Sequence, residues 1–314
     1  MKRKLFIPLI TLLFIIVFAG CEYTGPVQNI PAEDIPEQND EEDTKEDIEA
    51  LFAELISRPE LAPEEKPEEI ISTQYAHLGL VQICYNSDSE AKLKLQVLNG
   101  DNKIVYNLRG DGSVESFSLQ YGSGEYTVRI MENVEDDQYM AVETKKFEAQ
   151  IDDEIDVYLN SIQNVNWDYD KLPIEDVPYI VYESLSTGES RLLYECSEDL
   201  YFFVTDNIDY DNDKINTLPY NYLPDIEETY TDKSGLCYDY ASLFASMLRS
   251  IGVPAKLVKG YTSEQPNVYH AWTEVYIEGR WMILDPTMGS NEFGEFVLLD
   301  AEKSSNDYVK VYEY

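Results

Sequence analysis

The stretch KSGLCYDYASLFASMLRSIGVPAKLVKGY (residues 233–261) decides how this chain folds, together with HAWTEVYIEGRWMILDPT (residues 270–287). Its first part predicts a helix, with Ser234 as the N-cap and Gly252 and Pro254 as stop signals. Cys237 then falls in the first turn, where unpaired N–H groups and the helix dipole favour a thiolate. The apolar residues at helical spacing are Ala241, Phe244, Ala245, Leu248 and Ile251.

The second part predicts an antiparallel hairpin. Apolar and polar residues alternate from His270 to Ile277, Gly279 and Arg280 make a tight connection, and residues 281–284 form the paired strand. Asp285 stands at the end of that strand, so it should lie near His270. A carboxylate there could hold the imidazole in one tautomer.

These motifs resemble the transglutaminase-like superfamily, which has a papain-like architecture. The G-x-C motif with its helical continuation spans residues 235–255, H-A-W-x-E-V-Y spans 270–276, and D-P-T spans 285–287. The resemblance covers about residues 197–299. It implies an α+β fold, in which the helix that carries Cys237 packs on an antiparallel sheet. It also implies Cys237 as nucleophile, His270 as general base and acid, and Asp285 as the orienting acid.

The beginning of the chain reads as an export signal. Three basic residues precede an apolar run, and residues 1–20 end at Cys21. This junction resembles a bacterial lipobox, which implies lipidation of Cys21 and an extracytoplasmic location at the cell membrane. Residues 21–71 are acidic and rich in proline, and we expect a largely extended linker there, with a short helix possible near residues 48–56.

Two further regions follow the linker. Short alternating runs with glycine turns in residues 72–151 predict a small β-sandwich-like domain, and SGEYTVRI resembles the closing strands of immunoglobulin-like modules. Residues 152–314 form the expected transglutaminase-like catalytic domain. Within it we expect helices near residues 153–165 and 200–209, a solvated loop at the acidic run 206–213, and a last sheet strand at 293–300.

The composition restricts the partners. A net charge of −38 argues against nucleic acid, because phosphates would be repelled. Four cysteines, with Cys21 assigned to lipid and Cys237 to chemistry, do not make a disulfide framework. The pattern calls for no cofactor and no metal.

The function expected from these features is hydrolysis of peptide or amide bonds through a Cys-His-Asp triad and a thioester acyl-enzyme. The substrate would be a protein or peptide at the cell surface. Acyl transfer to an amine, as in a transglutaminase, uses the same triad and stays open. An inactive module for surface binding or adhesion on the same fold is the alternative from another class.

Overall fold

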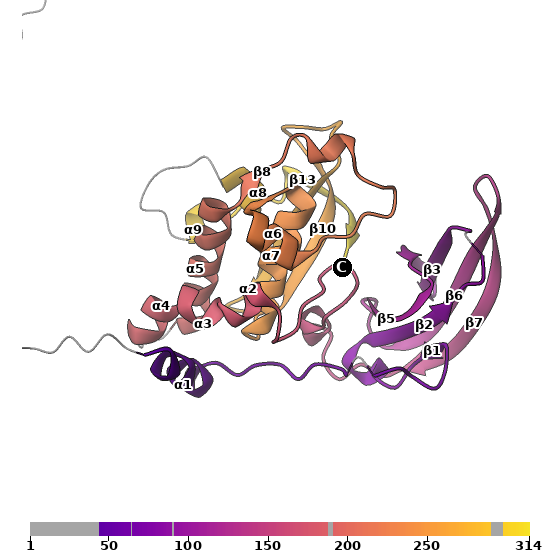
Figure 1. The fold of residues 1–314 in the computed structure, drawn as a ribbon, viewed down its shortest axis with the longest axis horizontal. Coiled ribbons are helices and arrows are strands. Elements are labelled where there is room, and N and C mark those ends of the chain that lie inside the picture. The colour runs from indigo at the N-terminus through magenta and orange to yellow at the C-terminus, as the bar shows by residue number, and fades with distance from the viewer. Residues whose placement is uncertain (1–43, 64, 90, 188–190, 290–297) are drawn as a thin grey trace, which may run out of the picture. The chain divides into compact units, whose positions relative to one another are not determined.

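The deciding stretch forms a long helix packed on an antiparallel sheet in the computed structural model of the chain (Figure 1). The structure describes residues 44–63, 65–89, 91–187, 191–289 and 298–314, all of which belong to one compact unit. The expected export signal, Cys21 and the first part of the expected linker lie outside these residues. None of the helices in the described part is long and apolar enough to cross a membrane.

The strands form two larger sheets and two smaller ones. The described strands are β1 (Ile71–Ser72), β2 (Leu80–Asn86), β3 (Leu93–Asn99), β4 (Asn102–Leu108), β5 (Asp111–Ser118), β6 (Gly124–Glu135), β7 (Gln138–Ala149), β8 (Asp209–Tyr210), β9 (Ser234–Gly235), β10 (Ala255–Thr262), β11 (His270–Ile277), β12 (Arg280–Leu284) and β13 (Tyr308–Glu313). The sheet orders are β1-β2-β5, β4-β3-β6-β7, β12-β11-β10-β13 and β8-β9.

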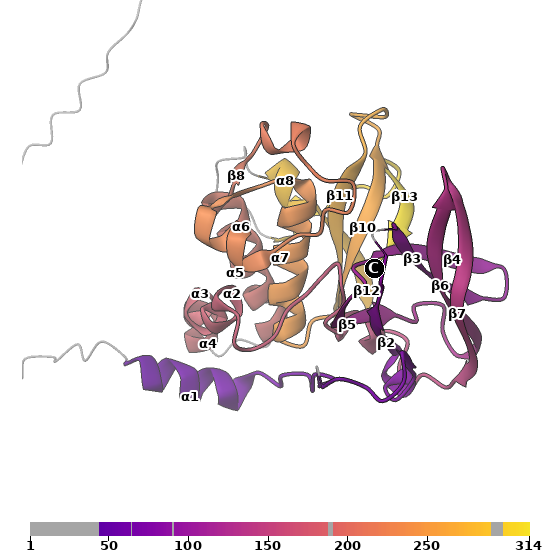
Figure 2. The same ribbon diagram turned by 45° about the vertical axis from the view of Figure 1, so that its right-hand side comes forward.

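The helices gather around the sheet that contains β10 and β11. The described α-helices are α1 (Lys45–Leu55), α2 (Leu172–Glu175), α3 (Val177–Ile180), α4 (Tyr182–Thr187), α5 (Leu192–Asn207), α6 (Ile226–Asp232), α7 (Cys237–Ser250), α8 (Pro286–Gly289) and α9 (Leu298–Ala301). Helix α7 lies between α5 and α6 on one side and β10 and β11 on the other (Figure 2). This arrangement confirms the expected α+β architecture, with the helix that carries Cys237 packed on an antiparallel sheet.

Helix α7 is buried on nearly all sides. Its residues from Asp239 to Ser250 are buried, which exceeds the single apolar stripe expected from the sequence. The small residues Ser242, Ser246 and Ser250 let neighbouring elements approach closely, and the Ser242 hydroxyl donates to the carbonyl of Asn164 at 3.0 Å. Helix α7 is therefore the central element of the core that holds the site.

Strands β11 and β12 form the expected hairpin. Thr273 lies opposite Leu284, and Ile277 lies opposite Arg280. The connection is Glu278-Gly279, one residue earlier than expected, and both residues have positive φ, 51° and 80°. Two such residues make the turn whose twist matches that of the strands. The register places the residue after Leu284, Asp285, at the same end as His270.

The region before the core forms a sandwich of two sheets. The expected short strands in residues 72–151 are present as β2 to β7, with alternating buried side chains. Tyr126 on β6 is fully buried, and its hydroxyl donates toward the carbonyls of Leu119 and Gly122 at 2.8 and 2.9 Å. A tyrosine that ties a strand to the preceding backbone in this way is a feature of immunoglobulin-like sandwiches.

The short helix that was possible near residues 48–56 of the linker is present as α1, because Thr44 and Asp47 make a capping box and Phe52 is buried against the core. Two other local expectations were wrong. The segment 153–165 has only a 3₁₀ turn, Asp156–Leu159, which ends at Asn160. The last sheet strand is β13; of the segment 293–300, the described residues 298–300 belong to α9. The helix expected near 200–209 exists as α5 and begins earlier.

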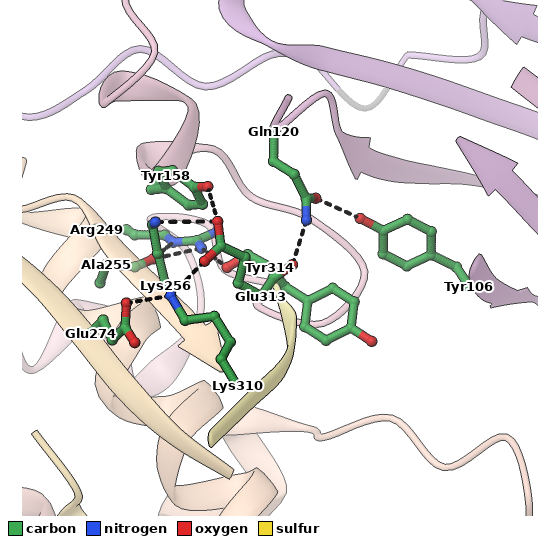
Figure 3. Close-up of polar contacts among 10 residues, drawn as sticks. All are labelled: Tyr106, Gln120, Tyr158, Arg249, Ala255, Lys256, Glu274, Lys310, Glu313 and Tyr314. Carbon is green, nitrogen blue, oxygen red and sulfur yellow. Dashed lines mark hydrogen bonds and ion pairs between the residues drawn. The ribbon is translucent and has the colours of Figure 1, made fainter. Parts of the chain in front are cut away.

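A buried cation joins α7 to the end of the sheet. Arg249 is fully buried, and it donates to the carbonyls of Ala255 at 2.9 and 2.6 Å and of Tyr314 at 3.1 Å (Figure 3). It also donates to the carbonyl of Asn160 at 2.5 Å. Burial lowers the pKa of Arg249 to about 9, which still leaves the guanidinium charged at neutral pH. The same region joins the sandwich to the core, because the Gln120 side chain donates to the carbonyl of Glu313 at 2.6 Å.

Replacing Arg249 should therefore destabilise the whole unit. Arg249→Met removes the guanidinium donors of the Ala255 and Asn160 carbonyls, while the Tyr314 carbonyl keeps the N–H of Leu257. At about 1–3 kcal/mol for each carbonyl left unpaired, we expect a loss of about 2 kcal/mol or more in the free energy of unfolding. Denaturant unfolding followed by tryptophan fluorescence measures it. Arg280→Met is the matched control, because Arg280 is half-exposed, pairs with Glu302 on the surface and should cost less than about 1 kcal/mol. Equal effects of the two variants would contradict this account.

Candidate active site

Cys237 is the first residue of α7 and lies partly exposed at its N-terminal end. The expected N-cap, Ser234, is wrong: Ser234 belongs to β9, and Leu236 occupies the cap position. The carboxylate of Asp239 instead accepts from the Leu236 N–H at 2.8 Å, which satisfies one donor at the helix start. The sulfur of Cys237 thus lies at the positive end of a buried helix.

His270 and Asp285 lie in contact at the end of the hairpin. The Nε2–H of His270 donates to Oδ2 of Asp285 at 2.7 Å. The other side of the imidazole is within hydrogen-bonding reach of the Cys237 side chain. Because Nε2 is held by the carboxylate, Nδ1 is the ring nitrogen left for the sulfur. The structure thus brings together all three residues singled out from the sequence, while their catalytic role stays a prediction.

Of Cys237, His270 and Asp285, Asp285 makes the most side-chain hydrogen bonds. It is fully buried, and Oδ1 accepts from the N–H groups of Thr287 and Met288 at 3.2 and 3.3 Å. Oδ2 accepts from His270 and also from the Tyr308 hydroxyl at 2.9 Å. These contacts fix the orientation of the carboxylate. Sequence reasoning missed Tyr308, because it lies on β13, which was not recognised as a strand.

A cleft of about 600 Å³ opens beside the sulfur and the imidazole. Its wall is largely apolar and aromatic, and it contains one lysine, Lys259, besides His270. The residues that line it, besides Cys237, His270 and Lys259, include Tyr210, Ile215, Leu218, Tyr238, Val268, Tyr269 and Met288. The surface that this wall offers is therefore more apolar than charged.

One tyrosine faces the sulfur from a neighbouring strand. Tyr210 on β8 lies opposite Gly235, two residues before Cys237, and lines the cleft. Burial, followed by the nearby charges of Cys237 and Asp239, raises the pKa of its hydroxyl, which therefore stays a donor at neutral pH. Other tyrosines upstream are engaged elsewhere, since the Tyr222 hydroxyl donates to Asp239 and the Tyr230 hydroxyl to Asp176.

The remaining cysteines of the described chain are remote from this cleft. Cys84 and Cys196 are both free thiols and both buried. Burial raises the pKa of Cys196 to about 12, so it has little thiolate at neutral pH. Within the same residues, no group of three His, Cys, Asp or Glu side chains is placed to hold a metal ion. In the acidic run, Asp211 accepts instead from the backbone N–H groups of Asp213 and Lys214 at 2.9 Å.

The pKa of His270 reports on this geometry. Burial lowers it, but the hydrogen bonds to Asp285 and Cys237 and the charges of both groups outweigh burial and raise the pKa to about 10. The unfolded value is about 6.5. The protonated imidazole therefore stabilises the fold fully below about pH 6.5, and this contribution is lost as the pH rises through about 10.

An NMR titration of the histidine ring protons measures this pKa directly, since the chain has two histidines and His77→Asn removes the other signal. We expect His270 to titrate far above 6.5 in the parent chain. Asp285→Asn removes one charge and should lower the midpoint by about 1–3 pH units. A midpoint near 6.5 in the parent, or no response to Asp285→Asn, would show that the pair is not formed in solution.

Parts of this chain are similar to known proteins. Mouse Kyphoscoliosis peptidase is 30% identical over 137 residues, which are 39% of this chain and 21% of that protein. Protein YebA of Bacillus subtilis is 33% identical over 107 residues, 27% of this chain and 14% of that protein. The chain thus spans less than a quarter of the length of either relative. The crystal structure of red sea bream transglutaminase is similar over 69% of this chain and 49% of that one, at 15% identity and a TM-score of 0.31. Residues 182–286 match the model of the transglutaminase-like superfamily, and the chain therefore carries a domain of that superfamily.

Proposed function

We propose that this chain is a cysteine enzyme that cleaves peptide or amide bonds through a thioester acyl-enzyme on Cys237. The observation that carries the proposal is the contact chain from the Cys237 side chain through His270 to Asp285 at the edge of a cleft. A lone cysteine at a helix start is usually structural. A cysteine with a histidine in reach, itself held by a buried carboxylate, matches the requirements of nucleophilic catalysis.

The first half of the reaction uses the sulfur and the imidazole. The thiolate of Cys237 attacks the carbonyl carbon and forms a C–S bond, while the protonated imidazole of His270 gives its proton to the leaving amine as the C–N bond breaks. The raised pKa of His270, about 10, keeps that proton available at neutral pH. Asp285 holds the ring so that the proton-bearing Nδ1 faces the leaving group.

Two donors are placed to stabilise the oxyanion. The Cys237 N–H belongs to the first turn of α7, whose N–H groups have no partner within the helix. The hydroxyl of Tyr210 is the second donor that we propose, because it lines the cleft beside the strand that leads into Cys237. Both are neutral donors that need no proton transfer of their own.

Hydrolysis and acyl transfer differ in the second half of the reaction. Water attacks the thioester, His270 accepts its proton, and the C–S bond breaks to release an acid and the thiol. An amine in place of water would give transfer instead. The name of the mouse relative, a peptidase, supports hydrolysis as the first choice.

We extend the proposal to the location of the enzyme. Residues 1–20 and Cys21 predict export and lipidation, which would place the domain on the outer face of the cell membrane with proteins or peptides as substrates. Metabolic labelling with palmitate in a bacterial host should mark the parent chain and not Cys21→Ser. Labelling of both chains would refute an anchor at Cys21.

The nucleophile is tested by alkylation of the native chain with iodoacetamide near neutral pH, mapped by mass spectrometry. Cys237 should react first, while the buried Cys84 and Cys196 stay protected until the protein unfolds. His270→Gln should slow the reaction of Cys237, and Cys84→Ser is the matched control that leaves it unchanged. Reaction of Cys237 no faster than that of a thiol in an unfolded peptide would favour the binding module.

Turnover is tested with a peptide library, with and without an added primary amine. Cleavage in the absence of amine supports hydrolysis, and amide products in its presence support transfer. Cys237→Ala should abolish both, and His270→Gln should lower kcat/KM by about 10²-fold or more. Turnover that survives Cys237→Ala would refute the proposed mechanism.

A further inference from the structure

Lys259 places a positive charge in the cleft beside Cys237. It precedes Gly260, which lies opposite His270 in the sheet, and its side chain lines the same cleft as the sulfur. Its Nζ lies 3.3 Å from the ring centroid of Tyr238, the residue after Cys237, and 5.5 Å from that of Tyr314. The two rings hold the amine in place without neutralising it.

No carboxylate of the described chain lies within ion-pair distance of this amine. Lysines around the same sheet are paired, as Lys256 is with Glu313 at 3.2 Å and Lys310 with Glu274 at 2.8 Å. Asp239, the acid nearest to Cys237 in the sequence, pairs with Lys214 at 3.2 Å. Apart from the thiolate of Cys237, Lys259 therefore has no counter-charge in the described protein, although the chain has 61 acidic residues.

A largely buried ammonium without a partner costs free energy. Burial lowers the pKa of Lys259 to about 7, while the negative charge of Cys237 acts in the opposite direction. A carboxylate bound beside the amine would restore its charged form and remove that cost. The amine is therefore arranged to bind an anion, and it is not part of a structural ion pair.

We propose that Lys259 is a specificity residue that binds a carboxylate of the substrate next to the carbonyl attacked by Cys237. The inference rests on the proposed function and narrows its substrate class. Because most of the cleft wall is apolar, the preferred substrate is a peptide in which a carboxylate lies close to an apolar residue. An acidic side chain and a free C-terminal carboxylate share this chemistry.

Two alkylating agents with the same leaving group isolate the effect. Iodoacetate carries a carboxylate and iodoacetamide does not, so the ratio of their rate constants at Cys237 measures carboxylate binding. The full chain is used at about pH 6 and low salt, below the pKa of about 7, so that the amine is charged. Lys259→Met should lower the iodoacetate rate about tenfold more than it lowers the iodoacetamide rate, because any loss of thiolate at Cys237 affects both agents equally.

Two further variants serve as controls. Lys259→Arg should keep most of the iodoacetate preference, because it retains the charge. Lys103→Met removes an exposed positive charge on β4 and should leave the ratio unchanged, since salt screens distant surface charges. Reaction of Cys237 with iodoacetamide in Lys259→Met, with the buried Cys84 and Cys196 still protected, shows that the chain is still folded.

The outcomes separate the possible roles. If the ratio of the iodoacetate and iodoacetamide rate constants is unchanged in Lys259→Met, the proposal is overturned. An equal fall in both rates would also overturn it, because the lysine would then act on the thiol and not on the carboxylate. No reaction of Cys237 with either agent in the parent chain would overturn the proposed function itself, and this inference with it. Pairs of substrates taken from the library then identify which carboxylate is bound: one pair differs by Glu→Gln in the peptide, and the other by amidation of its C-terminus. A lower rate of cleavage for the uncharged member of one pair, seen in the parent chain and absent in Lys259→Met, supports the assignment.

Discussion

The arrangement of the core depends on the charge of Arg249. A guanidinium enclosed by protein must direct its donors to acceptors, and here the acceptors are main-chain carbonyls of three segments: Asn160 after the sandwich, Ala255 at the start of β10, and Tyr314 after β13. Because each carbonyl is buried and paired, no segment can shift without leaving a donor or an acceptor unsatisfied. One side chain at the end of α7 thus fixes the helix against the sheet and against the connection that leads from the sandwich (Figure 3).

The hydrogen bonds of Arg249 also affect the opposite end of α7, where Cys237 lies close to His270. The strand that Arg249 holds, β13, brings the Tyr308 hydroxyl to Asp285. Strand β13 approaches β10 closely at Gly260, where a Cβ would lie 2.0 Å from the carbonyl oxygen of Val309. Any larger residue at this position would push β13 away and remove the second hydrogen bond to Oδ2. The orientation of the imidazole therefore depends on backbone contacts well outside the three residues of the proposed triad.

Much of the site could be predicted from the sequence because its main parts are local. Helical spacing places Cys237 at a helix start, and a two-residue turn forces His270 and Asp285 to one end of a hairpin. The parts that were missed join the site through pairings between distant segments. Tyr308 arrives on an edge strand with mostly exposed residues, so it has no clear alternation, and Tyr210 lies on a strand of two residues. The acidic and proline-rich surroundings of α1 allowed a short helix to be expected there, but they did not indicate that Phe52 is buried against the core.

The electrostatics of the helix start show why local charge cannot be judged from sequence neighbours alone. In the sequence, Asp239 stands two residues after Cys237 and would oppose a thiolate. In the structure its carboxylate is fully buried and is engaged by Lys214 at 3.2 Å, by the Tyr222 hydroxyl at 2.6 Å and by the Leu236 N–H at 2.8 Å. These contacts offset its charge locally, because donors and a cation in contact act more strongly than a group at longer range. The positive end of α7, the imidazole of His270 and the amine of Lys259 are then the positive groups near the sulfur, even in a chain with a net charge of −38.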